Sequence, residues 1–238
     1  MSTPNNPLLN HRSARLAMLG RTALFKGVHE RDLEELAVLL QPRTFGRGVY
    51  LWQTGDAADV ACLVVKGQVK VSRINADGEE LVTGMFLAGE IFGEMSLVVE
   101  DPVRLMDAQA VEPTECLTLS RDAFLQYLDN HPRVMRRMLA TLASNIRRMD
   151  ETFSESAFLD IPGRVARKLL DLAEVHGEQT ADGIRIRMRL SQGTLAGMVA
   201  ARRENVNRSL SRFASEGLIK LDSGSITIVD QSRLRRYV

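Results

Sequence analysis

The sequence has few cysteines and no long apolar run. Cys62 and Cys116 are its two cysteines, and both stand in alternating apolar segments, so we expect buried thiols and neither a disulfide nor a metal pair. No segment approaches the roughly 20 apolar residues that span a bilayer. Residues 1–10 have prolines and polar residues where a secretory signal has an apolar core. The sequence therefore predicts a cytoplasmic protein with no membrane partner.

Histidine is also scarce, and its positions exclude several kinds of cofactor. The four histidines are His11, His29, His131 and His176, so residues 30–130 contain none. A metal-dependent enzyme built on a double-sheet β-roll needs clustered His and carboxylate ligands, and a haem sensor needs an axial ligand. An iron–sulfur cluster needs about four cysteines. We therefore expect no metal, haem or iron–sulfur cluster, and no enzymatic activity.

The chain of 238 residues is long enough for one medium and one small domain. Its net charge of +1 conceals an asymmetry. Residues 160–238 carry 14 Lys and Arg against 9 Asp and Glu, whereas the rest of the chain carries 17 against 21. A basic small domain joined to an acidic larger one is typical of a nucleic-acid reader attached to a sensor.

The first half of the chain has a strand pattern. Residues 49–119 consist of short alternating runs separated by Gly, Asp and Asn. Short strands and tight turns at this spacing predict an antiparallel sandwich or barrel. A helix is expected before it, near Glu30–Leu40, because Leu33, Leu36 and Ala37 fall on one helical face.

Beyond Asp122 the period becomes helical and unusually regular. Six apolar residues are spaced by 4, 3, 4, 3 and 4 positions: Met135, Leu139, Leu142, Ile146, Met149 and Phe153. This is the a/d repeat of a coiled coil, and it predicts that residues 131–157 form a helix that joins two copies of the chain as the dimer interface. An amphipathic helix packed on its own β-domain is the alternative, although its apolar face is normally broader than this stripe.

Residues 158–238 predict a separate domain that begins at a helix cap. Asp160 can accept a hydrogen bond from the first turn of the next helix, and Pro162 stands in that turn, where a missing N–H costs nothing. The segment Ile184–Leu190 then alternates apolar residues with Arg, as a strand with one buried face does. A domain boundary therefore falls near 157–161.

Two helices around a short turn follow this strand. Ser191 can cap a short helix over 192–198, and a longer helix is expected from about 202 to 215. The segments 218–221 and 226–229 predict a hairpin. Two helices followed by a hairpin are typical of a winged helix-turn-helix.

The longer helix has an apolar side and a polar side. Val206, Leu210 and Phe213 lie together toward the expected core. An outward arc of about 140° holds the polar residues Arg203, Glu204, Asn207, Arg208 and Ser211. Arg can donate two hydrogen bonds to guanine and Glu can accept one from cytosine, and the first turn of this helix is the part that enters the major groove. These residues therefore favour contact with base edges, with solvated surface charges as the alternative.

Three segments resemble one known family, the catabolite-activator/FNR family of bacterial transcription regulators. Leu195–Arg208 resembles the family's helix-turn-helix signature, whose recognition helix carries Arg-Glu and a second Arg four positions after the Glu. Phe158–Ala166 resembles its hinge, and Gly89–Glu94 resembles its ligand-cassette motif. The resemblance covers nearly the whole chain in the expected order.

The resemblance implies an α+β fold of three parts. Residues 1–130 are expected to form N-terminal helices and an antiparallel β-roll of the cyclic-nucleotide-binding type, a double-stranded β-helix. Residues 131–157 would be the dimerisation helix, and 158–238 the winged helix-turn-helix. The implied function is a sequence-specific regulator, activator or repressor, that binds a palindromic site on double-stranded DNA as a homodimer, is controlled allosterically by a small effector and contacts RNA polymerase.

By position, the resemblance implies that Arg203, Glu204 and Arg208 read bases in GTGA-like half-sites. The full set of expected DNA contacts is Ser191, Arg202, Arg203, Glu204, Asn207 and Arg208. The family usually has Ser or Thr in place of Arg202, and since Arg cannot cap a helix, the loss of the cap is worth about 1 kcal/mol. Arg202 can still bind phosphate electrostatically.

The family's effector site is matched in part. Relatives that bind cyclic AMP hold the ribose with a Gly and a Glu, and grip the cyclic phosphate with an Arg followed by Ser or Thr. The corresponding residues here are Gly93, Glu94, Arg104, Leu105, Met149 and Asp150. The first three match, whereas Leu105 lacks the hydroxyl donor, and Met149 and Asp150 replace hydroxyl residues that contact adenine.

Arg104 has two interpretations. It grips an anionic effector through its planar fork, or it is a structural partner of a local carboxylate such as Glu94 or Asp107. Cyclic AMP is the first candidate effector, and cyclic di-GMP, another small ligand and activity without a ligand stay open. A further alternative is a cyclic-nucleotide-binding module that acts on a protein partner instead of DNA. The helix that carries Arg203 and Glu204 argues against this alternative.

Overall fold

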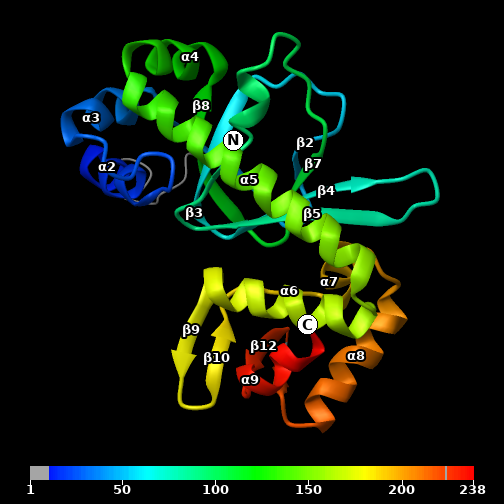
Figure 1. The fold of residues 1–238 in the computed structure, drawn as a ribbon. Coiled ribbons are helices and arrows are strands. Elements are labelled where there is room, and N and C mark those ends of the chain that lie inside the picture. Colours follow the sequence, from blue (N-terminus) through cyan, green and yellow to red (C-terminus); the bar gives the residue numbers. More distant parts are fainter. Residues whose placement is uncertain (1–10, 223) are drawn as a thin grey trace. The chain divides into compact units, whose positions relative to one another are not determined.

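A computed structural model of the chain describes residues 11–222 and 224–238, with the side chains of 148 and 151–157 left out. Two compact units comprise residues 11–73 with 84–146, and residues 74–83 with 147–238. The first contains an antiparallel β-roll with helices beside it, and the second contains helices and a small sheet (Figure 1). The predicted α+β class is therefore correct.

Two helices precede the roll. α2 spans Arg12–Arg21 and α3 spans Glu30–Leu39. Leu33, Leu36 and Ala37 of α3 are buried, as the helical spacing predicts.

The roll consists of two four-stranded antiparallel sheets, with strand orders β1-β8-β3-β6 and β2-β7-β4-β5. Their strands are β1 (Gln41–Phe45), β2 (Tyr50–Trp52), β3 (Val60–Lys66), β4 (Gln68–Ile74), β5 (Glu80–Leu87), β6 (Ile91–Phe92), β7 (Asp107–Ala110) and β8 (Thr114–Ser120). A 3-10 turn, η1, spans Met95–Leu97. The chain thus crosses repeatedly between the sheets, as the pattern of short strands predicts.

The central strand β3 is buried on both faces because each face has its own apolar cluster. Leu63 packs in a cluster shared with α3 and the helix after β8, whereas Cys62 and Val64 pack in a cluster between the two sheets. Successive side chains of a strand point to opposite faces, so one strand serves both clusters. Cys62 and Cys116 are buried free thiols, as expected.

α4 (Arg121–Asn130) follows β8, and α5 (Pro132–Phe158) follows α4 directly. α5 thus begins and ends one residue later than the predicted dimerisation helix. Its first turns are fastened to the roll, because Val134 and Met138 are buried in the cluster that contains Leu63.

In the second unit, α6 (Ile161–His176) has Asp160 as its N-cap, as predicted: the Oδ1 of Asp160 accepts a hydrogen bond of 2.9 Å from the N–H of Gly163. The later helices are α7 (Gln192–Met198), α8 (Arg203–Ser215), α9 (Gln231–Leu234) and the 3-10 turn η2 (Arg235–Tyr237). A four-stranded sheet has the order β11-β12-β10-β9. Its strands are β9 (Gly177–Thr180), β10 (Gly183–Ile186), β11 (Ile219–Asp222) and β12 (Ser225–Ile228).

The strand predicted over Ile184–Leu190 is wrong in its length. β10 ends at Ile186, which pairs with Gly177, the first residue of β9, and its pairing with β12 covers only Ile184 and Arg185. The alternation is still correct for burial, since Met188 and Leu190 are buried beyond the end of the strand. β9 is the strand that the sequence pattern missed, as its residues are polar and exposed.

Candidate DNA interface and effector site

α7 and α8 form a helix-turn-helix with well-defined ends. The Oγ of Ser191 accepts a hydrogen bond of 2.9 Å from the N–H of Thr194 and so caps α7, as predicted. Ala200, in the turn, has a φ of 48°, a left-handed conformation that costs a non-glycine residue about 1 kcal/mol. Arg202 is the N-cap of α8 and makes no side-chain cap bond, as expected for Arg.

α8 divides into a buried and an exposed face. Val206, Leu210 and Phe213 are buried. The exposed residues include Arg203, Glu204, Asn207, Arg208 and Ser211. The structure therefore brings the expected base-reading side chains together on the solvent side of one helix, with Arg202 and Ser191 exposed at the two helix starts.

Gln192 links two of these side chains and was missed by the sequence analysis. Its Nε2 donates a hydrogen bond of 2.9 Å to Oδ1 of Asn207, and its Oε1 accepts one of 3.4 Å from Nε of Arg203. Because Gln192 stands in α7, the bridge exists only once the turn folds, so no local spacing signals it. Arg208 is held separately, by a hydrogen bond to Oδ1 of Asn205.

The far end of α8 is fastened to the end of the chain. The side-chain hydrogen bond from Arg212, 2.9 Å long, lowers the pKa of Glu216, and the hydroxyl of Tyr237 donates a second bond of 2.8 Å to the same carboxylate. The ring of Tyr237 also meets Phe213 edge-on, with 4.8 Å between centroids. These contacts hold α8 on its domain while its exposed face stays free.

In the β-roll, Arg104 is buried with 2% of its surface exposed. Its Nη1 donates a hydrogen bond of 3.0 Å to the carbonyl of Gly93, and its Nη2 donates one to the carbonyl of Val60. Within the described residues its Nε has no partner. Burial lowers the pKa of Arg104. The partners of Arg104 are therefore backbone carbonyls.

The two carboxylates considered as partners of Arg104 have other surroundings. Asp107 accepts hydrogen bonds from the backbone N–H and the hydroxyl of Thr54, at 2.6 and 2.9 Å. Glu94 is 8% exposed, and burial raises its pKa from 4.5 to about 7. The hydrogen bonds of Arg104 in the described part of the chain thus go to neither group.

The indole of Trp52, also missed by the sequence analysis, covers Arg104. The guanidinium carbon lies 3.8 Å from the centroid of the ring, which is a cation–π contact. Gly93 has a φ of 81°, and a Cβ there would lie 2.7 Å from Cη2 of Trp52. Glycine is therefore required both by the backbone and by the close approach of the indole. Trp52 is the chain's one tryptophan and stands in an alternating run. The sequence alone does not predict that its ring packs against Gly93 and Arg104.

The other three expected effector residues are exposed. Leu105 is 70% exposed, so its side chain does not line the interior beside Arg104. Met149 and Asp150 are exposed and stand on α5 beyond residue 146, in the second unit. The structure therefore brings Gly93, Glu94 and Arg104 together and adds Trp52.

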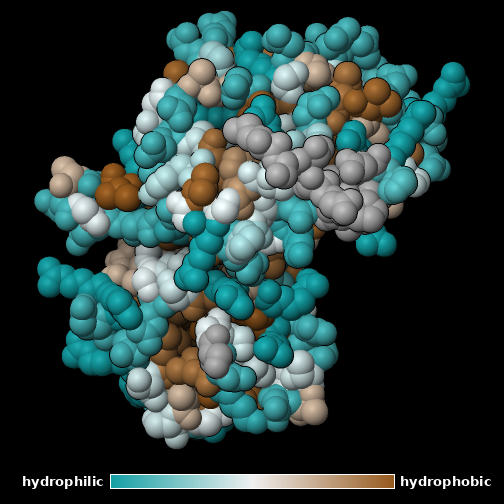
Figure 2. Space-filling view, turned by 180° about the vertical axis from the view of Figure 1, so that it is seen from behind, coloured by the Kyte–Doolittle hydropathy of each residue, from teal (hydrophilic) through white to brown (hydrophobic). Residues whose placement is uncertain are grey.

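The apolar stripe of α5 is largely uncovered. Leu139 is 61% and Ile146 59% exposed, Met135 and Met149 are also exposed, and Leu142 is half-buried. The side chain of Phe153 lies outside the described residues. On the face drawn in Figure 2 most of the coloured residues are hydrophilic, and the apolar residues gather in several patches. The stripe is thus not the inner face of a helix packed on its own β-domain.

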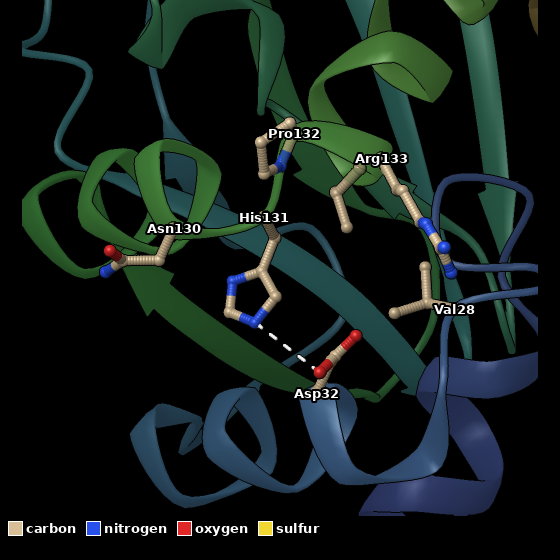
Figure 3. A pocket seen from close by; sticks show the side chains of 7 residues that line it. Val28, Asp32, Asn130, His131, Pro132 and Arg133 are labelled. Carbon is tan, nitrogen blue, oxygen red and sulfur yellow. Dashed lines mark ion pairs between the residues drawn. The ribbon is translucent and has the colours of Figure 1, made fainter.

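A surface pocket of about 240 Å³ lies where α4 meets α5 (Figure 3). Its lining is Val28, Asp32, Asn130, His131, Pro132, Arg133 and Val134. The ring of His131 stacks on Tyr127, and its Nε2 lies 3.9 Å from Oδ1 of Asp32. These contacts connect α3 to the start of α5, and we assign them a structural role.

Among the described residues, no three or more His, Cys, Asp or Glu side chains are grouped so that they could hold a metal ion. None of the helices in the described part of the chain has both the length and the apolar character to cross a membrane.

Comparison with known proteins relates both halves of the chain to described families. Residues 42–131 match the cyclic nucleotide-binding domain, and residues 163–237 match the Crp-like helix-turn-helix domain. The chain is 33% identical to the CRP-like cAMP-activated global transcriptional regulator of Mycobacterium tuberculosis, over 92% of this chain and 97% of that protein. It is 30% identical to the cyclic AMP receptor protein of Thermus thermophilus, over 89% and 94%.

A solved structure shares the fold. The structure of FixK2 from Bradyrhizobium japonicum matches with a TM-score of 0.74 at 18% identity, over 83% of this chain and 96% of that chain.

Glu94 makes the stability of the β-roll dependent on pH. Because its folded-state pKa of about 7 exceeds the ordinary 4.5, the folded state binds the proton more tightly, and the free energy of unfolding falls as pH rises between these values. The fall is about 3 kcal/mol at most. Glu94→Gln stays neutral and should lose this decline, which urea unfolding at about pH 5 and pH 8 measures. Parallel pH curves for the two proteins would contradict the burial of a protonated Glu94.

Proposed function

Since the chain belongs to the CRP/FNR family of bacterial transcription regulators, we propose that it is a homodimer that reads a palindromic DNA site with α8 under the control of an anionic effector in its β-roll. Its relatives are transcription regulators and not enzymes. In this proposal residues 1–130 are the sensor, 131–157 the dimerisation helix and 158–238 the DNA-binding domain. The observation that carries it is the division of α8 into a buried apolar face and an exposed face with Arg203 and Glu204 in its first turn.

The chemistry of the exposed face supports base recognition. Arg203 and Arg208 can each donate two parallel hydrogen bonds to O6 and N7 of guanine, and Glu204 can accept one from N4 of cytosine. The bridge from Gln192 to Asn207 and Arg203 limits the side-chain rotamers before DNA arrives. Arg202 and Ser191, exposed at the starts of α8 and α7, supply contacts to phosphate, where the helix dipoles also favour negative charge.

The exposed stripe of α5 supports a parallel homodimer. Leu139 and Ile146 are apolar residues more than half exposed on a helix whose neighbouring face, at Val134 and Met138, is buried in its own unit. A second copy of the same stripe buries all of these side chains with the 4-3 spacing of a coiled coil. Two-fold symmetry then requires DNA half-sites about 34 Å apart, centre to centre.

Arg104 supports an anionic effector. Among the described residues, no carboxylate is hydrogen-bonded to the buried guanidinium of Arg104 and its Nε has no partner, so it is a cation that an anion can stabilise. Cyclic AMP is the first candidate, because several relatives at 30% identity or more are named for it. Leu105 supplies no hydroxyl to a phosphate, so cyclic di-GMP, another anion and activity without a ligand are the alternatives. RNA polymerase is the protein partner that family membership favours.

Arg203→Ala should lower the sequence preference more than the overall affinity. Each lost bidentate contact costs about 1–3 kcal/mol at one base pair per half-site. Arg202→Ala is the matched control, since a lost phosphate contact weakens all sequences alike and reduces the salt slope by about one. Competitive binding to a randomised palindromic library at two salt concentrations measures both effects. If Arg203→Ala keeps the wild-type preference, α8 is not the reading helix.

Ile146→Lys should weaken the dimer by about a hundredfold or more, because it places an unpaired charge in the apolar seam. Ile146 is 59% exposed in the single chain, so the fold should survive. Ser144→Lys adds the same charge at an exposed position outside the stripe and should leave the dimer intact. Sedimentation at micromolar concentration measures the oligomeric state, and a monomeric wild type would refute the dimer.

Arg104→Lys should weaken cyclic AMP binding by roughly a hundredfold, because Lys keeps the charge but cannot reproduce a planar two-point grip. Arg43→Lys, at an exposed position of β1, is the control and should bind as the wild type does. Calorimetry with cyclic AMP and cyclic di-GMP gives the affinities. Equal binding by Arg104→Lys and wild type would remove Arg104 from the effector site.

A further inference from the structure

We propose that Trp52 occupies the effector site of the β-roll in the free protein, and that the effector enters by displacing the indole from Arg104. The inference rests on the proposed effector site and adds a specificity-determining residue to it. The effector site of the free protein would then be self-occupied, that is, filled by a side chain of the same protein. An anionic effector would compete with the indole of Trp52 for the guanidinium of Arg104.

The contacts of Arg104 leave one face of the guanidinium to Trp52. Two nitrogens bond to the carbonyls of Gly93 and Val60, and the indole lies 3.8 Å above the guanidinium carbon. The indole itself is 9% exposed and packs against Phe92 at 5.3 Å between centroids. A desolvated cation–π pair of this kind is stronger than an exposed one. An effector therefore has to replace a favourable contact.

The indole also covers Gly93. Its Cη2 and Cζ2 lie 2.7 and 3.1 Å from the point where a Cβ of Gly93 would stand. In the proposed site, the ribose of a cyclic nucleotide lies against Gly93 and its phosphate against Arg104. The indole occupies the space beside both Gly93 and Arg104, so the nucleotide and the indole cannot be there at the same time.

The position of Trp52 in the fold allows the side chain to move. β2 has three residues at the edge of its sheet, pairs with β7 and has a register shift between Tyr50 and Trp52. The following loop is held independently, because the N–H of Arg104 donates to the carbonyl of Asp56 at 2.9 Å and Arg104 accepts from Gly55 at 2.8 Å. A change of rotamer at Trp52 therefore leaves these backbone bonds intact.

Wild-type fluorescence tests the displacement directly, because Trp52 is the one tryptophan of the chain. Titration with cyclic AMP, and separately with cyclic di-GMP, should shift the emission to longer wavelength as the indole leaves the buried guanidinium. The shift should saturate at the concentration at which calorimetry shows binding. Binding without any change in emission would overturn the inference and leave the effector site standing.

Trp52→Leu tests the competition. The variant should bind cyclic AMP at least about tenfold more tightly than wild type, which is about 1.4 kcal/mol. Phe86→Leu is the matched control: it shortens an aromatic residue that stacks on Phe92 in the same cluster, and should change the affinity less than twofold. If Trp52→Leu does not fold, the wild-type titration still decides.

Each remaining outcome has one meaning. Binding by Trp52→Leu but not by wild type supports the self-occupied site. Equal or weaker binding by a folded Trp52→Leu overturns it while the proposed effector site stands. If neither protein binds either nucleotide, the inference and the nucleotide effector both fail, whereas DNA recognition by α8, measured separately, is unaffected.

Discussion

The desolvation of one guanidinium is the constraint around which the β-roll is arranged. A buried Arg104 needs acceptors, and it takes them from backbone carbonyls of two different segments, at Gly93 and Val60. The indole of Trp52 covers it from a third. The same burial raises the pKa of Glu94 to about 7. Strands of both sheets therefore meet at a single cation, and any ligand that changes the environment of Arg104 acts on all of them.

α5 gives the chain two kinds of surface in one element. Its first turns are anchored by Val134 and Met138, whereas the stripe that includes Leu139 and Ile146 is left to solvent in the single chain. A helix anchored by one face keeps its own packing while a neighbouring face stays uncovered. α8 is held in the second unit in the same way, by its own buried apolar face.

The features that could be predicted from the sequence are those that local periodicity and helix capping determine. Asp160 and Ser191 cap helices as expected, α5 was placed within one residue at each end, and the two faces of α8 follow from helical spacing. Contacts that close over long distances were not predictable. Trp52 reaches Arg104 from 52 positions away in the chain, the bridge at Gln192 needs a folded turn, and β10 ends opposite the first residue of β9. The exposure of Leu105 likewise depends on tertiary structure.

The amide of Gln192 touches Asn207 through its nitrogen and Arg203 through its oxygen. The amide nitrogen of Gln192 donates and its oxygen accepts, so the orientation of the amide that suits Asn207 also fixes which atom faces Arg203. In the proposed complex with DNA, the base pairs that Arg203 and Asn207 contact are therefore not read independently. We expect a change of side chain at Arg203 to alter the orientation of Asn207, so that mutations at the two positions combine non-additively. The binding specificity of such a protein would then diverge by coupled substitutions at Arg203 and Asn207, while Gln192, which bridges them, stays the same.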